Sequence, residues 1–539
     1  MANAQDKQVE DSMAMGTATR PESKAMPVGV RGVNAPSMSR LQHISLQYGL
    51  DCNDEELEVY KEKMIEVLRA FKSLAAMTEP IPEVKYPRTP GYRPKPQDNP
   101  YNAWYWRCDI RGACTGLLAG RTVAIKDSIQ VAGVPMMNGS RVLEGFMPPI
   151  DATVVTRVLD AGGHITGKAA CEDMCLSGSG SMCGTGPVRN PHKEGHVTGG
   201  SSSGCAALVA AREVDMAIGG DQGGSVRFPA CWSGIVGLKP TYGLVPYTGA
   251  CSMERSLDHL GPMAATVRDC ALLLQTIAGY DDGNDTRQPR DLRVPNYTEQ
   301  LKGDPKQLKI GVVKEGFANC HDPVNGIVRG ALDKLRAAGA TVEDVSIPAH
   351  IEASGVFTTI TAHGIGESML KAEGVQIGDR GMQSTALADA QRRGFRAHSQ
   401  YLSYVTKLFL LTSEYVREEY GFHFYSKARN ISHEITASFN AALEKYDVLA
   451  MPTIVYPAPE IPTTTTPIGE MIDHSSGMLQ NTAVFNVTGH PAISINAGFT
   501  ADGLPVGLML VGKLWDDVTV LDAAYAWERL RGADDTPRV

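Results

Sequence analysis

One segment of the 539-residue chain, residues 199–230, constrains the fold more than any other. It reads GGSSSGCAALVAAREVDMAIGGDQGGSVRFPA, and two of its serines, Ser201 and Ser225, each follow a Gly-Gly pair. Glycine lets the backbone turn sharply and approach a ligand closely, because it has no Cβ atom. Such turns can expose a serine hydroxyl and aim successive backbone N–H groups at one point. The segment is therefore typical of an acyl-transfer site, which needs a nucleophile and an oxyanion hole.

The two serines and an upstream lysine resemble the signature of the amidase signature family, serine hydrolases that use a Ser-Ser-Lys triad. The family's nucleophile lies in Asp-x-Gly-Gly-Ser-[Ile/Val]-Arg, and residues 221–227 read DQGGSVR, which matches Ser225 to it. The family's bridging serine is the first serine of Gly-Gly-Ser-Ser, which is Ser201 here. Its lysine lies in an apolar strand upstream, and VAIKDSI supplies Lys126.

The resemblance extends along most of the chain. It covers residues 101–113, 116–140, 233–249, 258–269, 485–498 and 504–512. With Asp-Gln rather than Asp-Thr before Gly-Gly-Ser, the sequence is most similar to bacterial amidases that are often paired with nitrile hydratase. The resemblance implies an α/β protein with the amidase signature fold, a central mixed β-sheet flanked by helices, here with an N-terminal helical extension.

The resemblance also implies the roles of the triad. Ser225 would form an acyl-enzyme, Ser201 would relay the proton, and Lys126 would be the general base, which requires a neutral lysine. Burial in an apolar strand disfavours the charged form of a lysine. Asp127 would favour that charged form if its side chain pointed inward. A cis peptide bond between Gly200 and Ser201 is implied as well.

The loop around Ser225 is expected to supply the remaining groups of the site. The backbone N–H groups of four consecutive residues are predicted to form the oxyanion hole: Gln222, Gly223, Gly224 and Ser225. Three further residues are expected to support the loop and the relay: Ser202, Asp221 and Arg227. A single Gly-Gly-Ser is usually only a turn, but all these residues in order, with the flanking blocks, favour catalysis.

Composition excludes several classes of protein. A net charge of −9 argues against a dedicated nucleic-acid binder, and no apolar run reaches the ~18 residues of a membrane-spanning helix. The 11 cysteines lack paired spacing, so reduced thiols in a cytoplasmic protein are expected. Cys171, Cys175 and Cys183 suggest a metal site only weakly, because no second ligand pair follows at a suitable distance. Neither a metal nor an organic cofactor is expected.

The chain is predicted to have three parts. Residues 1–40 are expected to be a disordered leader, and residues 41–98 an N-terminal helical region, with a helix over 53–77, and a proline-rich linker. The apolar stripe of that helix would pack within the chain or against a second copy of it, as in a homodimer. Residues 99–535 are expected to be the catalytic domain. Its helical excursion at about 350–445 would wall the substrate pocket, although aromatic residues at helical spacing more often belong to a core.

The predicted function is hydrolysis of small aliphatic or aromatic primary amides to a carboxylic acid and ammonia, with no nucleic-acid or membrane partner. A glutamine-hydrolysing amidotransferase subunit of the same family remains an alternative, because it shares the triad. The N-terminal helical extension disfavours it. An alternative of another class is a non-catalytic scaffold, which the intact triad disfavours.

Overall fold

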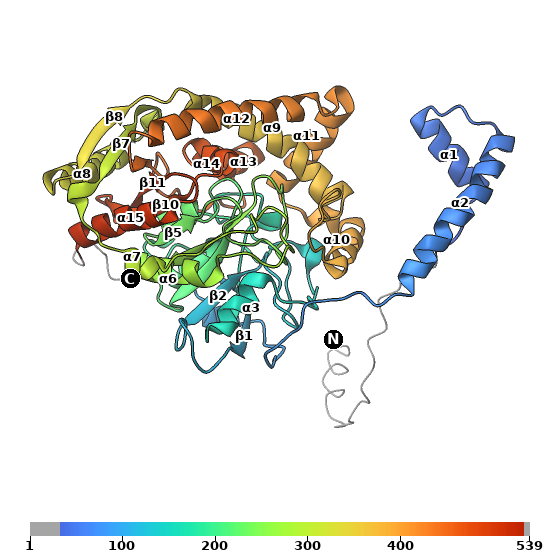
Figure 1. The fold of residues 1–539 in the computed structure, drawn as a ribbon, viewed down its shortest axis with the longest axis horizontal. Coiled ribbons are helices and arrows are strands. Elements are labelled where there is room, and N and C mark those ends of the chain that lie inside the picture. Colours follow the sequence, from blue (N-terminus) through green and yellow to red (C-terminus); the bar gives the residue numbers. More distant parts are fainter. Residues whose placement is uncertain (1–32, 533–539) are drawn as a thin grey trace, which may run out of the picture. The chain divides into compact units, whose positions relative to one another are not determined.

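The computed structural model describes residues 33–532 and divides into two units, residues 1–81 and 82–539. In the first unit, α1 (Met38–Tyr48) and α2 (Asp54–Ala75) follow each other along the chain (Figure 1). The predicted helix over 53–77 is thus present as α2, and Asn53 and Glu56 form a reciprocal capping box at its start. The predicted leader lies outside the described residues up to residue 32. Its last residues are wrongly predicted, because Ser37 caps α1 and the helix begins at Met38.

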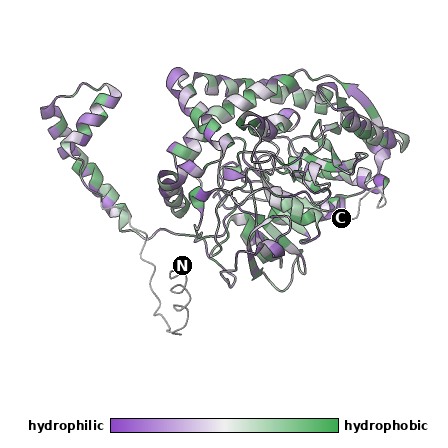
Figure 2. Cartoon of the chain, turned by 180° about the vertical axis from the view of Figure 1, so that it is seen from behind, coloured by the Kyte–Doolittle hydropathy of each residue, from purple (hydrophilic) through white to green (hydrophobic). Residues whose placement is uncertain are grey.

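The apolar stripe of α2 is buried at only one point. Leu57 is 4% exposed in the pair of helices, whereas Tyr60, Phe71 and Leu74 are exposed. Figure 2 shows hydrophobic residues interspersed with hydrophilic ones along both helices. Helical spacing alone therefore predicted the helix correctly but not which of its apolar side chains are buried.

The proline-rich segment is extended but is attached to the second unit. Asp160 accepts hydrogen bonds from Lys85 Nζ (2.9 Å) and Tyr86 Oη (2.8 Å). Arg88 forms an ion pair with the buried carboxylate of Asp151. Residues 82–98 are therefore part of the second unit rather than a free linker, because their polar side chains have partners there.

An eleven-stranded mixed sheet forms the centre of the second unit, as predicted. Strand β2 pairs in parallel with β3 and β4, and β7 pairs in parallel with β8 and β9, whereas the other pairs are antiparallel. In sheet order the strands are β1 (Trp104–Arg111), β3 (His164–Ala169), β2 (Thr122–Lys126), β4 (Met216–Asp221), β6 (His259–Ala264), β5 (Val236–Lys239), β10 (Ala492–Phe499), β11 (Pro505–Val511), β9 (Val448–Pro452), β7 (Lys309–Val313) and β8 (Thr341–Val345).

Helices flank this sheet (Figure 1). They are α3 (Thr153–Asp160), α4 (Ser203–Ala210), α5 (Arg227–Trp232), α6 (Val267–Ile277), α7 (Tyr297–Gln300), α8 (Asp322–Ala337), α13 (Ile468–Ser476), α14 (Ala483–Thr488) and α15 (Asp517–Arg531). Helix α4 is buried at every position, which its small and apolar sequence SGCAALVA permits. No helix in the described ranges is both long enough and apolar enough to cross a membrane.

The predicted excursion at 350–445 is present as four helices. They are α9 (Ala349–Ile365), α10 (Thr385–His398), α11 (Tyr404–Tyr420) and α12 (His423–Leu443). Three of its tyrosines, Tyr401, Tyr404 and Tyr415, are exposed, so they belong to neither core nor pocket. Helix α11 has a narrow buried face, Val405, Thr406 and Ser413.

Candidate active site

Lys126 and Ser201 form a buried hydrogen-bonded pair. Lys126 is the last residue of strand β2, and its Nζ donates to Ser201 Oγ at 2.7 Å and to the carbonyl of Gly220 at 3.2 Å. Neither side chain is exposed. The peptide bond between Gly200 and Ser201 is cis, as the resemblance implies. Both acceptors of the lysine are thus uncharged oxygens, one of a hydroxyl and one of a carbonyl.

The carboxylate of Asp127 is paired with a different lysine. Asp127 Oδ1 lies 3.0 Å from Lys168 Nζ, and both side chains are fully buried. Asp127 Oδ2 accepts a hydrogen bond from the backbone N–H of Met137 at 2.9 Å. Burial raises the pKa of Asp127, and the nearby Lys168 counteracts this effect in part. Asp127 therefore points inward, but toward Lys168 on β3 rather than toward Lys126.

Ser225 lies in the loop that follows β4. The backbone N–H groups of Gln222, Gly223, Gly224 and Ser225 donate no hydrogen bond within the described residues. Four consecutive free donors of this kind can stabilise an oxyanion. The Ser202 N–H donates to the carbonyl of Ser225 at 3.2 Å. In residues 33–532, however, no hydrogen bond joins the hydroxyls of the two predicted catalytic serines.

Glycine is required at position 224 of this loop. Gly224 has a φ of +141°, and a Cβ atom there would lie 2.4 Å from the ring of Phe228. The preceding residue, Gly223, is held by Thr482, whose Oγ1 donates to its carbonyl at 2.5 Å. The loop is thus fixed by close backbone contacts that only glycine permits.

Asp221 and Arg227 form a buried ion pair that supports the same loop. The fully buried Arg227 guanidinium donates to both carboxylate oxygens of Asp221, at 2.9 and 3.0 Å. The Val226 N–H and the Asn486 amide donate to that carboxylate as well, at 3.1 and 2.8 Å. Burial alone would raise the pKa of Asp221, but Arg227 and Asn486 outweigh it, so the pKa lies well below its ordinary value. A bidentate pair of this kind fixes orientation as well as charge.

Ser202 is hydrogen-bonded to strand β4, which precedes the loop. Its Oγ donates to the carbonyl of Gly220 at 3.1 Å and accepts from the N–H of Gly220 at 3.2 Å. The same carbonyl accepts from Lys126. Ser202 therefore holds one of the two acceptors of the buried lysine in place.

The cysteines near the pair do not form a metal site. In the described part of the chain, no three His, Cys, Asp or Glu side chains are placed to hold a metal ion. Cys171, Cys175 and Cys183 are buried, and none of the 11 cysteines, all within that part, forms a disulfide. A hydrogen bond from Cys171 lowers the pKa of the Cys175 thiol to about 6. No motif in the sequence marks this thiol.

Glu172 is a second group that sequence analysis missed. Its Oε2 accepts from the N–H of Met182 at 2.7 Å, and its side chain packs against Gly200, where a Cβ atom would lie 3.0 Å from Oε1. The N–H of Glu172 donates to the carbonyl of Ser201 at 3.3 Å. Burial raises the pKa of Glu172 to about 7. The carboxyl group thus supports the turn that carries Ser201.

A large apolar cavity of about 690 Å³ adjoins residues 221–227, the candidate catalytic loop. A Cβ atom on Gly223 would lie 2.8 Å from Phe357 and 3.0 Å from Leu479, and both residues line the cavity. The other lining residues come mainly from α9, α11 and the segment 472–480: Glu315, Ala318, Asn319, His350, Ile351, Ser354, Thr358, Thr361, Ala362, Val405, Leu408, Phe409, Thr412, Ile472, Ser476, Gly477 and Gln480. No sequence signal distinguishes these side chains from ordinary core residues.

Comparison with known proteins identifies the family. A sequence model of the amidase family, described as Amidase, matches residues 103–521. The chain is 44% identical over 484 residues to an enantioselective amidase of Rhodococcus rhodochrous, covering 88% of this chain and 93% of that protein. It is 37% identical to a glutamyl-tRNA(Gln) amidotransferase subunit of Haloarcula marismortui, covering 79% of this chain and 99% of that protein.

Solved structures of the same family share the fold. A glutamyl-tRNA(Gln) amidotransferase subunit of Thermotoga maritima superposes with a TM-score of 0.66 at 31% identity, covering 80% of this chain and 88% of that one. The peptide amidase of Stenotrophomonas maltophilia gives a TM-score of 0.63 at 28% identity, covering 77% and 83%. The chain belongs to the amidase signature family, whose members are hydrolases of carbon–nitrogen bonds.

Proposed function

We propose that this protein hydrolyses small aliphatic or aromatic primary amides to a carboxylic acid and ammonia. Ser225 is the nucleophile, Ser201 relays protons, and Lys126 is the general base. The observation that carries the proposal is the buried bond of 2.7 Å between Lys126 Nζ and Ser201 Oγ. A lysine can act as a base only when it is neutral, so the proposal requires a neutral Lys126. Lys168 pairs with Asp127, and the two hydrogen-bond acceptors of Lys126 are uncharged oxygens.

The reaction proceeds through an acyl-enzyme. Ser225 Oγ attacks the amide carbon while its proton passes through Ser201 to Lys126. The free N–H groups from Gln222 to Ser225 stabilise the oxyanion, where one donor contributes roughly 10²–10³ in rate. The carbon–nitrogen bond then breaks, and the proton returns from Lys126 through Ser201 to the nitrogen, which leaves as ammonia. Water hydrolyses the Ser225 ester by the same relay.

The large cavity favours an apolar acyl group. Phe357 and Leu479 place apolar surface directly against Gly223, beside the proposed oxyanion hole. A cavity of about 690 Å³ accommodates aromatic and branched aliphatic groups. The similarity to the enantioselective amidase of Rhodococcus rhodochrous supports an amide as the substrate.

The glutamine-hydrolysing alternative is less well supported. Free glutamine carries a carboxylate that a binding site must neutralise, and none of the residues lining the large cavity, all in the described part of the chain, is a lysine or arginine. Its one carboxylate, Glu315, accepts hydrogen bonds from Ser346 and the N–H of Ile347. The cavity therefore suits a neutral substrate better than an amino acid. A non-catalytic scaffold is disfavoured by the buried Lys126–Ser201 pair.

Ammonia release tests the proposal. The purified protein is incubated without cofactor with propionamide, isobutyramide, benzamide and glutamine. We expect turnover of the simple amides and little turnover of glutamine. Activity on glutamine alone, or activity only with an added partner protein, would favour the amidotransferase alternative.

The proposal includes the protein's cellular compartment and its oligomeric state. Thiols that are all free fit the reducing cytoplasm. The exposed apolar residues Tyr60, Phe71 and Leu74 of α2 fit an interface between two copies of the chain. We therefore assign the protein to the cytoplasm as a homodimer, with no nucleic-acid or membrane partner and no cofactor.

A further inference from the structure

We propose that the side chain of Gln222 binds the leaving nitrogen of the scissile amide through its carbonyl oxygen, Oε1. This inference rests on the proposed function and adds a group that touches the substrate. Gln222 is 5% exposed, and its Oε1 is buried without a hydrogen-bond partner among residues 33–532. A buried acceptor left unpaired destabilises a protein. Such an atom therefore points to a ligand that supplies the missing N–H.

The hydrogen bonds of Tyr247 distinguish the nitrogen, Nε2, of the Gln222 amide from its oxygen, Oε1. Tyr247 has one hydroxyl proton, and it donates this proton to the carbonyl of Cys251 at 2.9 Å. Its oxygen must then accept the second bond, of 2.8 Å, and only the Nε2 group of Gln222 can donate it. Nε2 therefore faces Tyr247, and Oε1 is the end left for a ligand.

The Gln222 amide lies beside the groups that protonate the leaving nitrogen. A Cβ atom on Gly220 would lie 3.6 Å from Gln222 Nε2 and 3.6 Å from Lys126 Nζ, so the amide group and the lysine both lie against Gly220. Lys126 in turn is 2.7 Å from Ser201 Oγ. In the proposed reaction, a nitrogen that takes its proton from Ser201 therefore comes close to the Gln222 amide.

The step itself is balanced within the chain and the substrate. The electron pair of the carbon–nitrogen bond passes to the nitrogen, which takes a proton from Ser201 Oγ. Lys126 replaces that proton, and the carbonyl of the Ser225 ester re-forms. One N–H that the nitrogen keeps throughout donates to Gln222 Oε1, and this bond strengthens as positive charge develops on the nitrogen.

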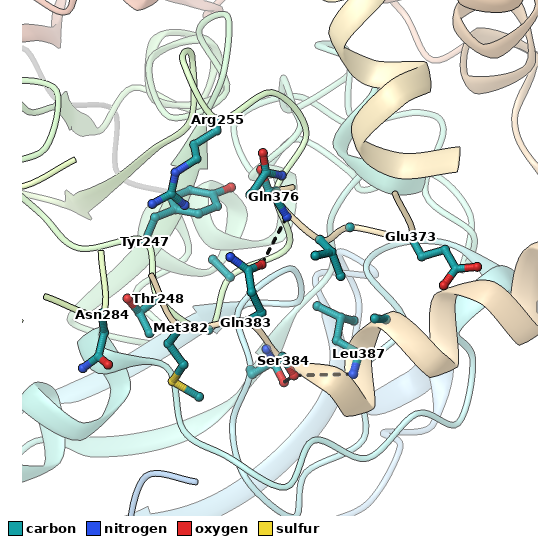
Figure 3. Close-up of a pocket in the computed structure, with 17 residues that line it drawn as sticks. Tyr247, Thr248, Arg255, Asn284, Glu373, Gln376, Met382, Gln383, Ser384 and Leu387 are labelled. Carbon is teal, nitrogen blue, oxygen red and sulfur yellow. Dashed lines mark hydrogen bonds between the residues drawn. The ribbon is translucent and has the colours of Figure 1, made fainter. Parts of the chain in front are cut away.

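Consecutive residues of the catalytic loop thus face different surroundings. Gly223 faces Phe357 and Leu479 of the apolar cavity. Gln222 faces Tyr247, which borders a polar cavity of about 50 Å³ together with Gln376 and Gln383 (Figure 3). A volume of that size holds a molecule as small as water or ammonia. The loop therefore places apolar surface on the acyl side and hydrogen-bonding groups on the nitrogen side.

The test compares an amide with an ester of the same acyl group. Benzamide has a leaving nitrogen with N–H groups, whereas methyl benzoate has a leaving oxygen without them. We expect Gln222→Met to lower kcat/KM for benzamide by about 10- to 100-fold, the range of one hydrogen bond to a charged group. The value for methyl benzoate should fall by less than about threefold, because the backbone oxyanion hole and the relay are retained. Tyr247→Phe should lower the benzamide value by a smaller factor, because the amide then loses its anchor.

A control variant distinguishes a specific role of Gln222 from a general loss of activity. Gln391→Met removes a buried amide of α10 that lies outside the catalytic loop and lines neither cavity, and it should change neither value. Equal losses on both substrates in Gln222→Met and in Tyr247→Phe would overturn the inference, as would no loss on either. Turnover of neither substrate by the unaltered protein would instead overturn the proposed function.

Discussion

Lys168 controls the charge around the proposed base. Its Nζ lies 3.0 Å from Asp127 Oδ1, and both side chains are fully buried. Asp127 follows Lys126 in the sequence, and Lys168 is in register with Ile125 on the neighbouring strand. Removing one partner of a buried ion pair leaves an uncompensated charge and destabilises the fold by about 3–5 kcal/mol. This disturbance would lie directly beside the proposed base.

We therefore predict that Lys168→Met lowers the free energy of unfolding in urea by about 3–5 kcal/mol and also lowers kcat/KM for benzamide. The double variant Lys168→Met, Asp127→Asn removes both partners of the ion pair and should recover part of both losses. Values for the single variant that equal those of the unaltered protein would contradict this account.

Glu172 predicts how stability depends on pH. Burial raises its pKa from the ordinary value of 4.5 to about 7. Between these values the unfolded chain releases the proton while the folded protein keeps it. The free energy of unfolding therefore falls as pH rises through this window, by about 3 kcal/mol for this group, and levels off above it.

The variant Glu172→Gln removes that dependence and keeps an oxygen for the N–H of Met182. Urea unfolding at pH 5 and pH 8 should show the unaltered protein losing more stability than the variant, by about 2–3 kcal/mol. Equal losses in the two proteins would show that Glu172 is ionised in the folded state at pH 5.

At the scale of elements, α9 sets the size of the acyl pocket. Phe357 on this helix lies against Gly223 and lines the large cavity. Phe357→Ala should raise kcat/KM for naphthamide relative to benzamide by about tenfold, because the pocket gains the volume of a ring. Phe395→Ala, a similar truncation of a buried phenylalanine in α10, should leave that ratio unchanged. A ratio that changes equally in both variants would show a general loosening of the fold.

Helix α2 has its own testable consequence. If its exposed apolar residues form the interface of the proposed homodimer, the double variant Phe71→Glu, Leu74→Glu should elute as a monomer in light-scattering chromatography. Lys72→Glu places a similar charge on the same helix and should remain dimeric. A monomeric unaltered protein, or a double variant that stays dimeric, would exclude this interface.

At the scale of the whole molecule, the parts that were predictable are those with local signals. The glycine pairs before Ser201 and Ser225, and the short apolar strand ending in Lys126, each mark a backbone feature that few other residues allow. The mixed sheet followed from the family resemblance that these residues carry. The helix predicted over 53–77 from its apolar spacing is likewise present, as α2.

The parts that were not predictable depend on residues brought together from distant segments. Phe357 and Leu479 are separated by four α-helices, α10, α11, α12 and α13. Apolar side chains that line a cavity follow the same spacing as those in a core. The partner of Asp127 could not be inferred either, because it depends on the register of β2 against β3. Tertiary packing, rather than local preference, determines such contacts.

The central claim is that Ser225 forms an acyl-enzyme with Lys126 as its base. The most direct measurement is mass spectrometry of proteolytic peptides after acid quench of the protein during turnover of benzamide. The account predicts a benzoyl group on Ser225, absent from Ser225→Ala and strongly reduced in Lys126→Ala. A benzoyl group on another residue, or turnover by Ser225→Ala at an undiminished rate, would contradict it.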